Sequence, residues 1–573
     1  MCGITGQLRF DDKPVDRRLV KRMADSLSHR GPDGEGYYFS RRVGLGSRRL
    51  AIIDLEGGDQ PVLGRGRSLC LVSNNEIYNH TELRSELEAK GRVFRSSCDS
   101  EVILRLFEEG GERSFRRLEG MFAFAIWDDA EETLYLARDP FGIKPLYYYR
   151  DSTVFLFASE MRSLLEYPAL DRGLDLEALD AYFGSLALPE PRTVFRKVGK
   201  LPAGHFLKVR GDKVCVERYW EPRFAPSSAS SRGRAIRGGE LERELRERLE
   251  RTVKVSMRSD VPVGLLLSGG VDSSSVAAFA ARLSGKPLHT FSASFSEGEF
   301  DESPFSRLVA KSLGTRHHEV RVTKGSATRI ASRLTELMDE PFADSSSVPT
   351  YAVCELASRH VKTVLSGEGA DELFGGYPWH LPEAPKGKAW DSRALAEHPT
   401  RVIFAERERA ALYSDDWKGE LRRRRESGPR SDAPSRRNSL SALNRSLLED
   451  LRIYLPSDIL FKSDRVAMLH SLEVRVPFLN LPFAEFALRL PDASKVNGAT
   501  RKYLLKRAMR GRLPRAVLGR PKKGFSVPMD LWLWERGGWR EMIYDTIFSR
   551  RARERGQFDA KLLDRLRREH ERL

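Results

Sequence analysis

The stretch that most constrains the fold is an apolar run ending in a Ser-Gly-Gly turn, at residues 265–274. A strand, a glycine turn and a helix in this order build an anion site. Glycine lets the backbone approach a ligand closely, and the N–H groups of the first helical turn are unpaired. Ser268, Asp272, Ser273 and Ser274 add hydroxyls and a carboxylate suited to Mg²⁺ beside a phosphate. No lysine follows the glycines, so the Walker A pattern is excluded, and a plain strand-to-helix turn stays an open alternative.

From residue 263 onward, strand-like apolar runs alternate with helical segments. The strands are expected at 263–267, 288–295, 317–322 and 361–365, with helices such as 304–313 and 351–358 between them. Such alternation predicts a parallel sheet with helices on both faces and ligands at the carboxyl ends of the strands. A second glycine-rich turn, residues 366–377, follows the last of these strands. It carries Glu368, Asp371 and Glu372, acids suited to Mg²⁺ and to a reacting ammonia.

The N-terminus is unusual because Cys2 directly follows the initiator methionine. If Met1 is removed, the cysteine carries an α-amine with a pKa of about 8, which can act as a general base beside the thiol. Residues 3–8 read as a strand that would hold Cys2 on a rigid element. A second-position cysteine without any role is the alternative, and the dipeptide alone does not decide between the two.

The rest of the first half combines short alternating strands, such as 69–72 and 133–137, with helical segments near 18–27 and 81–90. Period-2 runs with helices between them predict a layered α+β domain with packed sheets. A stretch rich in Pro, Ser, Gly and Arg then runs to residue 239 and reads as an exposed linker.

Length and composition bound the remaining possibilities. A chain of 573 residues is too long for one core, so two or three domains are expected. The excess of 16 positive charges is spread among acids, which argues against nucleic acid; the one dense run, Arg422–Arg425, opens a stretch (422–439) expected to be a surface loop. Five cysteines without a Cys-x-x-Cys pair indicate neither disulfides nor zinc and fit a reducing cytoplasm. No secretory signal or membrane span is found.

The pair His317-His318 looks like a metal pair, but neighbours on a strand face opposite sides and no carboxylate spacing supports a site. These histidines are therefore expected to be structural.

Several short motifs occur in an ordered set along the chain, at residues 28–33, 49–54, 74–79, 99–103, 120–126, 137–148, 268–274, 366–377, 462–465, 471–480, 501–505 and 520–525. With Cys2, the first six resemble the class II glutamine amidotransferase domain. The whole set resembles the glutamine-hydrolysing asparagine synthetase family over nearly the full chain. The resemblance implies an N-terminal-nucleophile hydrolase sandwich over 1–215, a linker over 216–239, and an α/β ATP-pyrophosphatase-like domain with added helices over 240–573.

For the first domain, the resemblance implies a glutaminase. Cys2 would attack the side-chain amide of glutamine, and its α-amine would shuttle the proton. Arg49 would clamp the α-carboxylate of the substrate, and Glu76 and Asp99 would hold its α-ammonium.

The oxyanion hole would be formed by Asn74 and the backbone N–H of residue 75. Asn75 departs from the family, which usually has glycine there. The N–H survives this change, and asparagine tolerates positive φ best after glycine, so retained but slower glutaminase activity is expected.

For the second domain, the resemblance implies that ATP adenylates the side chain of aspartate and releases pyrophosphate, after which ammonia gives asparagine and AMP. Asp272 and Asp371 would ligate Mg²⁺, Glu368 would take a proton from ammonia, and Lys502 would stabilise charge at the reacting phosphate. The nucleotide itself would lie against Leu267, Ser268, Gly269, Gly270, Asp272, Ser273, Ser274, Ala293 and Gly367.

Two other readings stay open. A relative of the same fold could amidate a different carboxylate acceptor, and Asn480, where the family usually has aspartate, puts contacts near the acceptor in question. In the other reading, the chain is a basic nucleic-acid-binding protein with degenerate enzyme domains. That reading predicts salt-sensitive retention of the protein on DNA. The expected partners are glutamine, aspartate and ATP, with no nucleic acid and no membrane; a homodimer is left open.

Overall fold

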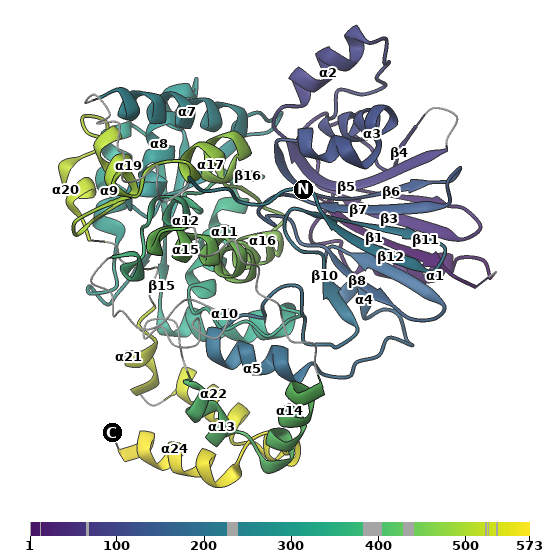
Figure 1. Cartoon of the computed structure of the whole chain (residues 1–573). Helices are drawn as coiled ribbons and strands as arrows, with labels where there is room; N and C mark the ends of the chain where they lie inside the picture. The colour runs from purple at the N-terminus through teal and green to yellow at the C-terminus, as the bar shows by residue number, and fades with distance from the viewer. Residues whose placement is uncertain are drawn as a thin grey trace.

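The computed structural model describes residues 2–11, 13–64, 68–225, 239–381, 404–427, 440–521, 524, 527–534 and 537–572. Two bodies lie side by side in Figure 1, a β-sandwich built by the N-terminal half and an α/β body built by the C-terminal half. Most of the expected linker, residues 226–238, lies outside the described residues. The last sandwich strand, β12, runs to Arg218 and so crosses the expected boundary at residue 215.

The sandwich consists of two antiparallel sheets of six strands each. The first has the order β10-β8-β9-β1-β3-β2, with β1 Cys2–Arg9, β2 Gly34–Phe39, β3 Val43–Arg49, β8 Tyr147–Arg150, β9 Val154–Ala158 and β10 Val198–Lys200. The second has the order β12-β11-β7-β6-β5-β4, with β4 Val62–Leu63, β5 Leu69–Ile77, β6 Gly120–Asp128, β7 Thr133–Arg138, β11 His205–Arg210 and β12 Lys213–Arg218.

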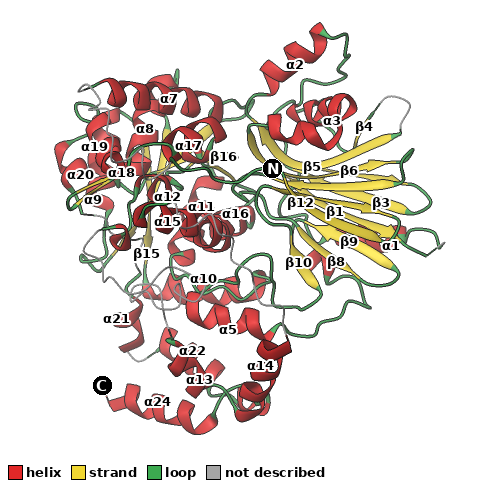
Figure 2. Ribbon diagram, in the orientation of Figure 1, coloured by secondary structure: helices red, strands yellow, loops and turns green. Residues whose placement is uncertain are grey.

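Strand alternation explains the layering, and β6 shows it clearly. Phe122 and Phe124 pack toward the helical side of the second sheet, whereas Ala123 and Ala125 join Leu45 in the core between the sheets. Figure 2 shows the resulting arrangement of strands between helices. The helices of this half are α1 Arg17–Asp25, α2 His80–Ala89, α3 Asp99–Gly110, α4 Met161–Leu164 and α5 Leu176–Ser185, of which α1, α3 and α4 pack against the strands. The layered α+β sandwich expected from the sequence is confirmed.

The second body is built on a parallel sheet of five strands in the order β15-β14-β13-β16-β17. The strands are β13 Val263–Leu266, β14 His289–Phe295, β15 Arg316–Val322, β16 Thr363–Leu365 and β17 Glu473–Arg475. The connecting and flanking helices are α7 Glu240–Ser256, α8 Val271–Leu283, α9 Ser303–Leu313, α10 Lys324–Leu337, α11 Ser347–Ser358 and α12 Ala370–Phe374. Strand order reverses between β13 and β16, which opens a crevice at their carboxyl ends. The predicted α/β domain is confirmed.

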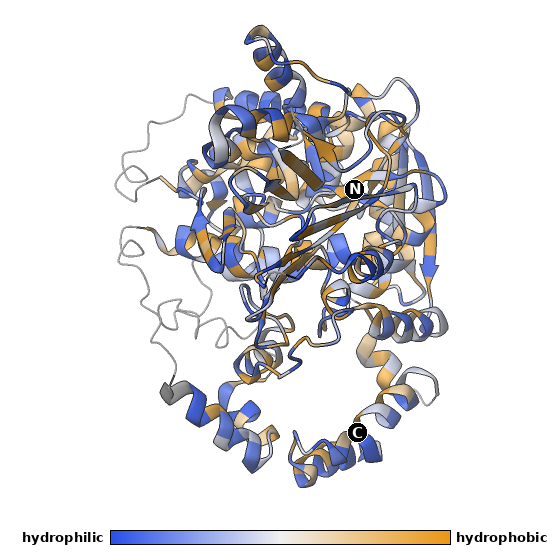
Figure 3. Cartoon of the chain, turned by 90° about the vertical axis from the view of Figure 1, so that its right-hand side faces the viewer, coloured by the Kyte–Doolittle hydropathy of each residue, from blue (hydrophilic) through white to orange (hydrophobic). Residues whose placement is uncertain are grey.

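Added helices complete this half of the molecule. They are α13 Glu406–Leu412, α14 Asp415–Ser427, α15 Ala442–Glu449, η6 Asp450–Ile459, α16 Leu460–Met468, α17 Leu481–Leu488, α18 Asp492–Lys495, α19 Tyr503–Ala508, α20 Arg515–Gly519, α21 Met529–Trp534, α22 Trp539–Ile547, α23 Arg550–Glu554 and α24 Ala560–Arg572. Figure 3 shows hydrophobic residues gathered in the strands and inner helices, with more hydrophilic helices near the C-terminus. None of the described helices combines the length and apolar character that a bilayer crossing requires.

The expectation of a loop from residue 422 was wrong for its first part. Residues 422–427 form the end of helix α14, because arginine is a good helix former and Glu420 accepts hydrogen bonds from Arg423 and Arg424 one turn later. Residues 428–439 lie outside the described part of the chain.

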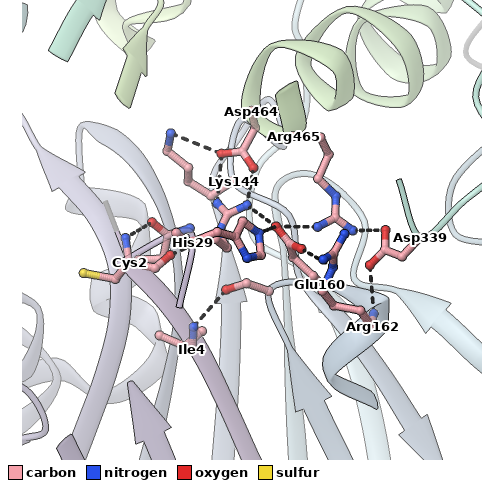
Figure 4. Close-up of polar contacts among 12 residues, drawn as sticks. Cys2, Ile4, His29, Lys144, Glu160, Arg162, Asp339, Asp464 and Arg465 are labelled. Atoms are coloured by element: carbon pink, nitrogen blue, oxygen red, sulfur yellow. Dashed lines mark hydrogen bonds and ion pairs between the residues drawn. The ribbon is translucent and has the colours of Figure 1, made fainter. Parts of the chain in front are cut away.

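A buried group of charges joins the two bodies, and Figure 4 shows it. Arg30, whose side chain is 0 % exposed, donates to Glu160 Oε1 at 2.8 Å and to both carboxylate oxygens of Asp464 at 2.8 and 3.1 Å. Arg465 lies 2.6 Å from the same Glu160 oxygen. Arg30 and Glu160 belong to the sandwich, whereas Asp464 and Arg465 belong to α16 of the other body. Burial alone would raise the pKa of Glu160, but Arg465, His29 and Arg30 outweigh it and hold that pKa well below its usual value.

Removing one partner from this group should destabilise the protein strongly. In Asp464→Ala, Arg30 keeps its buried charge but loses its bidentate partner, so we expect a loss of about 3–5 kcal/mol in unfolding free energy. Urea denaturation of the full chain measures this loss. The matched control is Arg423→Ala, an exposed pair on α14, for which we expect at most about 1 kcal/mol. Equal effects of the two substitutions would contradict a structural role for the buried group.

Candidate active site

Cys2 opens the central part of the first sheet. It is 6 % exposed, and its register partner across the β1–β3 ladder is Arg49. Its backbone N–H donates to Asn74 Oδ1 at 2.9 Å, and Gln60 Nε2 donates to its Sγ at 3.7 Å. If Met1 is removed, this nitrogen is the α-amine, and Asn74 Oδ1 would be the acceptor that orients it.

The Nδ2 atom of Asn74 is available to donate a hydrogen bond to a ligand. Asn74 is 0 % exposed, and its Nδ2 atom has no hydrogen-bond partner among the described residues. A buried donor without a partner is costly, and that cost is recovered when a negatively charged oxygen reaches it. Asn74 lies on β5 beside Cys2, so such an oxygen would arise where the thiol attacks a carbonyl group.

The neighbouring residues form a second hydrogen-bonded group. Asp99 Oδ2 accepts from Asn75 Nδ2 and from the Ile77 N–H, both at 2.7 Å, and Ser100 Oγ donates to Asn75 Oδ1 at 3.0 Å. Asn75 lies inside strand β5 and is not among the residues with positive φ, so no glycine-like backbone is demanded there. Its side chain instead ties β5 to the start of α3.

Glu76 reaches across to the other body. Its Oε2 lies 2.6 Å from Arg475 Nη2 on β17, and its Oε1 is buried without a hydrogen-bond partner among the described residues. Burial is the largest influence on its pKa and raises it; Arg475 opposes the rise, and the charge of Glu473 adds to it. An arriving ammonium group would therefore supply the second cation that stabilises the ionised form of Glu76.

Arg49 is near Cys2, but its guanidinium is engaged by the loop that follows β3. It donates to Leu55 O at 3.1 Å, to Asp59 Oδ1 at 3.2 Å and to the carbonyl oxygen of Asp54. Clamping a substrate carboxylate would require at least one of these contacts to be exchanged, and the role of Arg49 stays a prediction.

In the second body, the two glycine-rich turns meet at the crevice between β13 and β16. Ser268 Oγ lies 3.0 Å from Ser273 Oγ, which closes the first turn on itself. A Cβ atom at Gly367 would lie 2.5 Å from Ser273 N, so only glycine allows the second turn to pack against the start of α8. The close approach brings Asp272 and Asp371 to one place.

Lys502 lies between these two carboxylates. Its Nζ is 2.5 Å from Asp272 Oδ2 and 2.6 Å from Asp371 Oδ1, although the three residues are far apart in the sequence. The lysine is 3 % exposed and has φ +52°, an uncommon conformation for a side chain of this size. Gly376 permits the arrangement, since a Cβ there would lie 2.1 Å from Lys502 Cε. Two carboxylates already gathered around one cation have the oxygen donors that Mg²⁺ prefers.

A cavity of about 410 Å³ opens at these turns. Of the expected nucleotide and metal residues, the cavity is lined by Leu267, Ser268, Asp272, Ser273, Ala293, Gly367 and Asp371. Ser274 is fully buried and does not line it; nor do Gly269, Gly270 and Asn480. The Asn480 departure therefore does not alter the cavity wall.

Glu368 also lines the cavity, and its Oε2 has no hydrogen-bond partner among the described residues. Burial raises the pKa of Glu368, an effect that Lys462 and Ser463 offset only in part. A carboxylate with a raised pKa is a stronger base toward an incoming amine.

Sequence reasoning missed several residues of this wall. Lys462 Nζ donates to Asp344 Oδ2 at 2.6 Å and to Ser346 Oγ at 2.7 Å, and all three line the cavity. The only available signal was that Lys462 opens one of the motifs; no pattern connected it with Asp344. Gln60 beside Cys2 and Arg475 beside Glu76 were likewise not expected. In the motif 520–525, residues 522, 523 and 525 lie outside the described residues.

Comparisons with known proteins agree with the division of the chain into two bodies. The model of the glutamine amidotransferase domain matches residues 1–220, and that of asparagine synthase matches residues 244–572. Asparagine synthetase [glutamine-hydrolyzing] 1 of Bacillus subtilis (strain 168) is 35 % identical over 570 residues, covering 93 % of this chain and 88 % of that protein. Asparagine synthetase [glutamine-hydrolyzing] 3 of the same organism is 31 % identical, covering 92 % and 87 %.

A relative with a different name is amidase chyE of Penicillium rubens, 28 % identical over 93 % of this chain and 89 % of that protein. Among solved structures, glutamine phosphoribosylpyrophosphate amidotransferase of Bacillus subtilis overlaps 50 % of this chain and 65 % of that chain at 20 % identity, with a TM-score of 0.30, which is too low to support any conclusion. With one family model covering more than half of its residues and relatives matching nearly its whole length, the chain belongs to the asparagine synthase family and carries a glutamine amidotransferase domain in front.

Proposed function

We propose that this chain is a glutamine-dependent asparagine synthetase. It hydrolyses glutamine to glutamate and ammonia, adenylates aspartate with ATP, and aminates the adenylate to give asparagine and AMP. The observation that carries this proposal is the pairing of two sites in one chain. One has Cys2 beside Asn74, whose Nδ2 atom has no hydrogen-bond partner among the described residues. The other has Lys502 between Asp272 and Asp371, two carboxylates that line a cavity of about 410 Å³.

In the first site, the Cys2 thiol gives its proton to the α-amine, and the sulfur attacks the carboxamide carbon of glutamine. Asn74 Nδ2 donates to the oxyanion that forms, an electrostatic stabilisation that is available before the reaction begins. The α-amine returns the proton to the leaving nitrogen, ammonia departs, and water hydrolyses the thioester to glutamate. Glu76 and Asp99 hold the substrate ammonium, and Arg49 holds its carboxylate.

In the second site, the side-chain carboxylate of aspartate attacks the α-phosphorus of ATP, and pyrophosphate leaves. Lys502 stabilises the negative charge at the reacting phosphate, and the turn 268–274 holds the pyrophosphate. Mg²⁺, which Asp272 and Asp371 would hold, neutralises phosphate charge when bound. Ammonia then attacks the acyl carbon, Glu368 removes a proton from the new C–N bond's nitrogen, and AMP leaves.

A second candidate keeps this chemistry but changes the acceptor carboxylate. The observation behind it is that a relative of nearly full coverage is named an amidase. The acceptor would contact a charged part of the cavity wall formed by Lys462, Asp344 and Ser346. The lysine and the aspartate carry opposite charges, which suit the carboxylate and the ammonium group of an amino acid.

Supplying purified protein with ATP, Mg²⁺ and glutamine, with and without aspartate, tests the proposal. We expect aspartate to stimulate the release of AMP and pyrophosphate in equal amounts, together with asparagine. Stimulation by another carboxylic acid and none by aspartate would favour the second candidate. No nucleotide turnover with any acceptor would overturn both.

Replacing the oxyanion donor should affect only one half of the reaction. In Asn74→Ala, we expect the glutaminase kcat to fall by about 100–1000-fold, the usual loss for one such donor. Synthesis driven by added ammonium salt should persist, because the second site is intact. Glutamate release and ammonia-driven asparagine formation, measured on the same preparation, separate the two. Equal losses in both assays would contradict the division between the sites.

Replacing the buried lysine should abolish the other half. In Lys502→Met, we expect glutamine-driven and ammonia-driven synthesis to fall together by at least about 100-fold, since charge at the phosphate is no longer stabilised. Pyrophosphate release measures the loss. Lys286→Met, at an exposed lysine of the same body, is the matched control and should keep full activity. Normal pyrophosphate release by Lys502→Met would remove this lysine from the reaction.

A further inference from the structure

Three histidines from three separate segments meet at one edge of the parallel sheet. His289 is the first residue of β14, His318 is the third residue of β15, and His360 lies between α11 and β16. One ring nitrogen from each lies within 4.8 Å of the other two. Among the described residues, this is the one group of three or more histidines, cysteines and acids close enough to share a metal ion.

The cluster is separate from the nucleotide cavity. Parallel strands run in one direction, so residues at the start of β14 and before β16 lie at the amino edge of the sheet. The turns 268–274 and 366–377 follow the carboxyl ends of β13 and β16, at the opposite edge. None of the three histidines lines the 410 Å³ cavity.

The neighbouring His317 shows what a structural histidine looks like here. Its ring contacts Thr290 Oγ1 at 3.0 Å and Ser292 Oγ at 3.1 Å, on the other face of the strands. The expectation that adjacent histidines face opposite sides agrees with this arrangement. His317 has its hydrogen bonds satisfied within the protein, whereas His318 turns toward His289 and His360.

The three rings lie close together, and those of His289 and His318 are nearly parallel, with an interplanar angle of 6°. His289 Nδ1 and His318 Nε2 lie 3.0 Å apart, and the centroids of the His318 and His360 rings lie 4.2 Å apart. Phe291, which is fully buried, stacks on His318 at 5.1 Å and forms an apolar floor.

We propose that His289, His318 and His360 form a binding site for a divalent transition metal of the Zn²⁺ class. Imidazole nitrogens suit Zn²⁺ and its neighbours in the first transition row, and three of them with one water complete a tetrahedral set. Around such an ion the ligand nitrogens lie about 3.3 Å apart, given metal–nitrogen distances of about 2.0–2.1 Å. The separation of 3.0 Å between His289 Nδ1 and His318 Nε2 is close to that value, and the other nitrogen separations stay within 4.8 Å.

The position of the site indicates what the ion does. It would link β14 and its neighbour β15 to the segment entering β16, which lies on the far side of β13. Ala293 lies further along β14, and the turn with Glu368 follows β16. Since a ligand that binds only the folded state stabilises it, the ion would stabilise this sheet against unfolding.

Cobalt is the probe for the experiment, because tetrahedral Co²⁺ with nitrogen ligands has visible absorption that Zn²⁺ lacks. The full chain, stripped with a chelator and dialysed, is titrated with Co²⁺ and then with Zn²⁺. We expect one Co²⁺ per chain with tetrahedral-type bands that Zn²⁺ abolishes, and a Zn²⁺-dependent rise in Tm. His318→Gln and His360→Gln should each weaken metal binding by at least about 10–100-fold and remove the rise in Tm.

His317→Gln is the matched control, since it removes the adjacent ring on the other face, and His205→Gln in the sandwich is a remote one. Both should bind Co²⁺ like the unaltered chain. Circular dichroism identifies any variant that fails to fold, and His360 is exposed, so its substitution tests the site without disturbing the core. The proposal is overturned if His318→Gln and His360→Gln keep the bands and stoichiometry. It is also overturned if the unaltered chain binds Co²⁺ no more tightly than a variant that carries both substitutions.

Discussion

The molecule depends on a charge that water cannot reach. Arg30 is wholly buried at the junction of the two bodies, where Glu160 and Asp464 neutralise its guanidinium. Without these partners, the buried charge would strongly destabilise the fold. Its Nε also donates to the carbonyl oxygen of Cys2 at 3.3 Å. One side chain thus contacts both Cys2, the proposed nucleophile, and helix α16 of the second body. The position of Cys2 thus depends in part on Asp464, the residue of the other half that holds Arg30.

A similar dependence links the substrate side of the first site to the second body. Arg475 lies between Glu76 and Glu473, and it also donates to the carbonyl oxygens of Ser256 and Arg258. Because β17 pairs with β16, the strand that carries Arg475 is adjacent to the strand that leads to Glu368. The partner of Glu76 and the turn that carries Glu368 are therefore attached to neighbouring strands of one sheet.

Much of this architecture is readable from the sequence, and the reasons are local. Alternation of residues with a period of two predicts strands such as β6. The Ser-Gly-Gly turn predicts the first loop of the parallel sheet, because the spacing of glycines is a local property of the sequence. The expectation of a loop at residues 422–427 was wrong because it rested on the Arg-, Ser- and Pro-rich composition of 422–439. Glu420 accepts hydrogen bonds from Arg423 and Arg424 one turn later, which supports the helix instead. No local sequence pattern shows which residues far apart in the chain lie close together in space. Lys502 meets Asp272 across 230 residues, and His289 meets His360 only because parallel strands bring their starts to one edge.

The buried charges at the junction also limit how such proteins can be recombined. A chimaera that took its front half from one family member and its back half from another would inherit Arg30 and Glu160 from one parent and Asp464 and Arg465 from the other. Any mismatch in that set would leave a charge in the interior with nothing to neutralise it. Two halves of this fold can thus be combined only when the buried charges that each contributes to the junction neutralise one another.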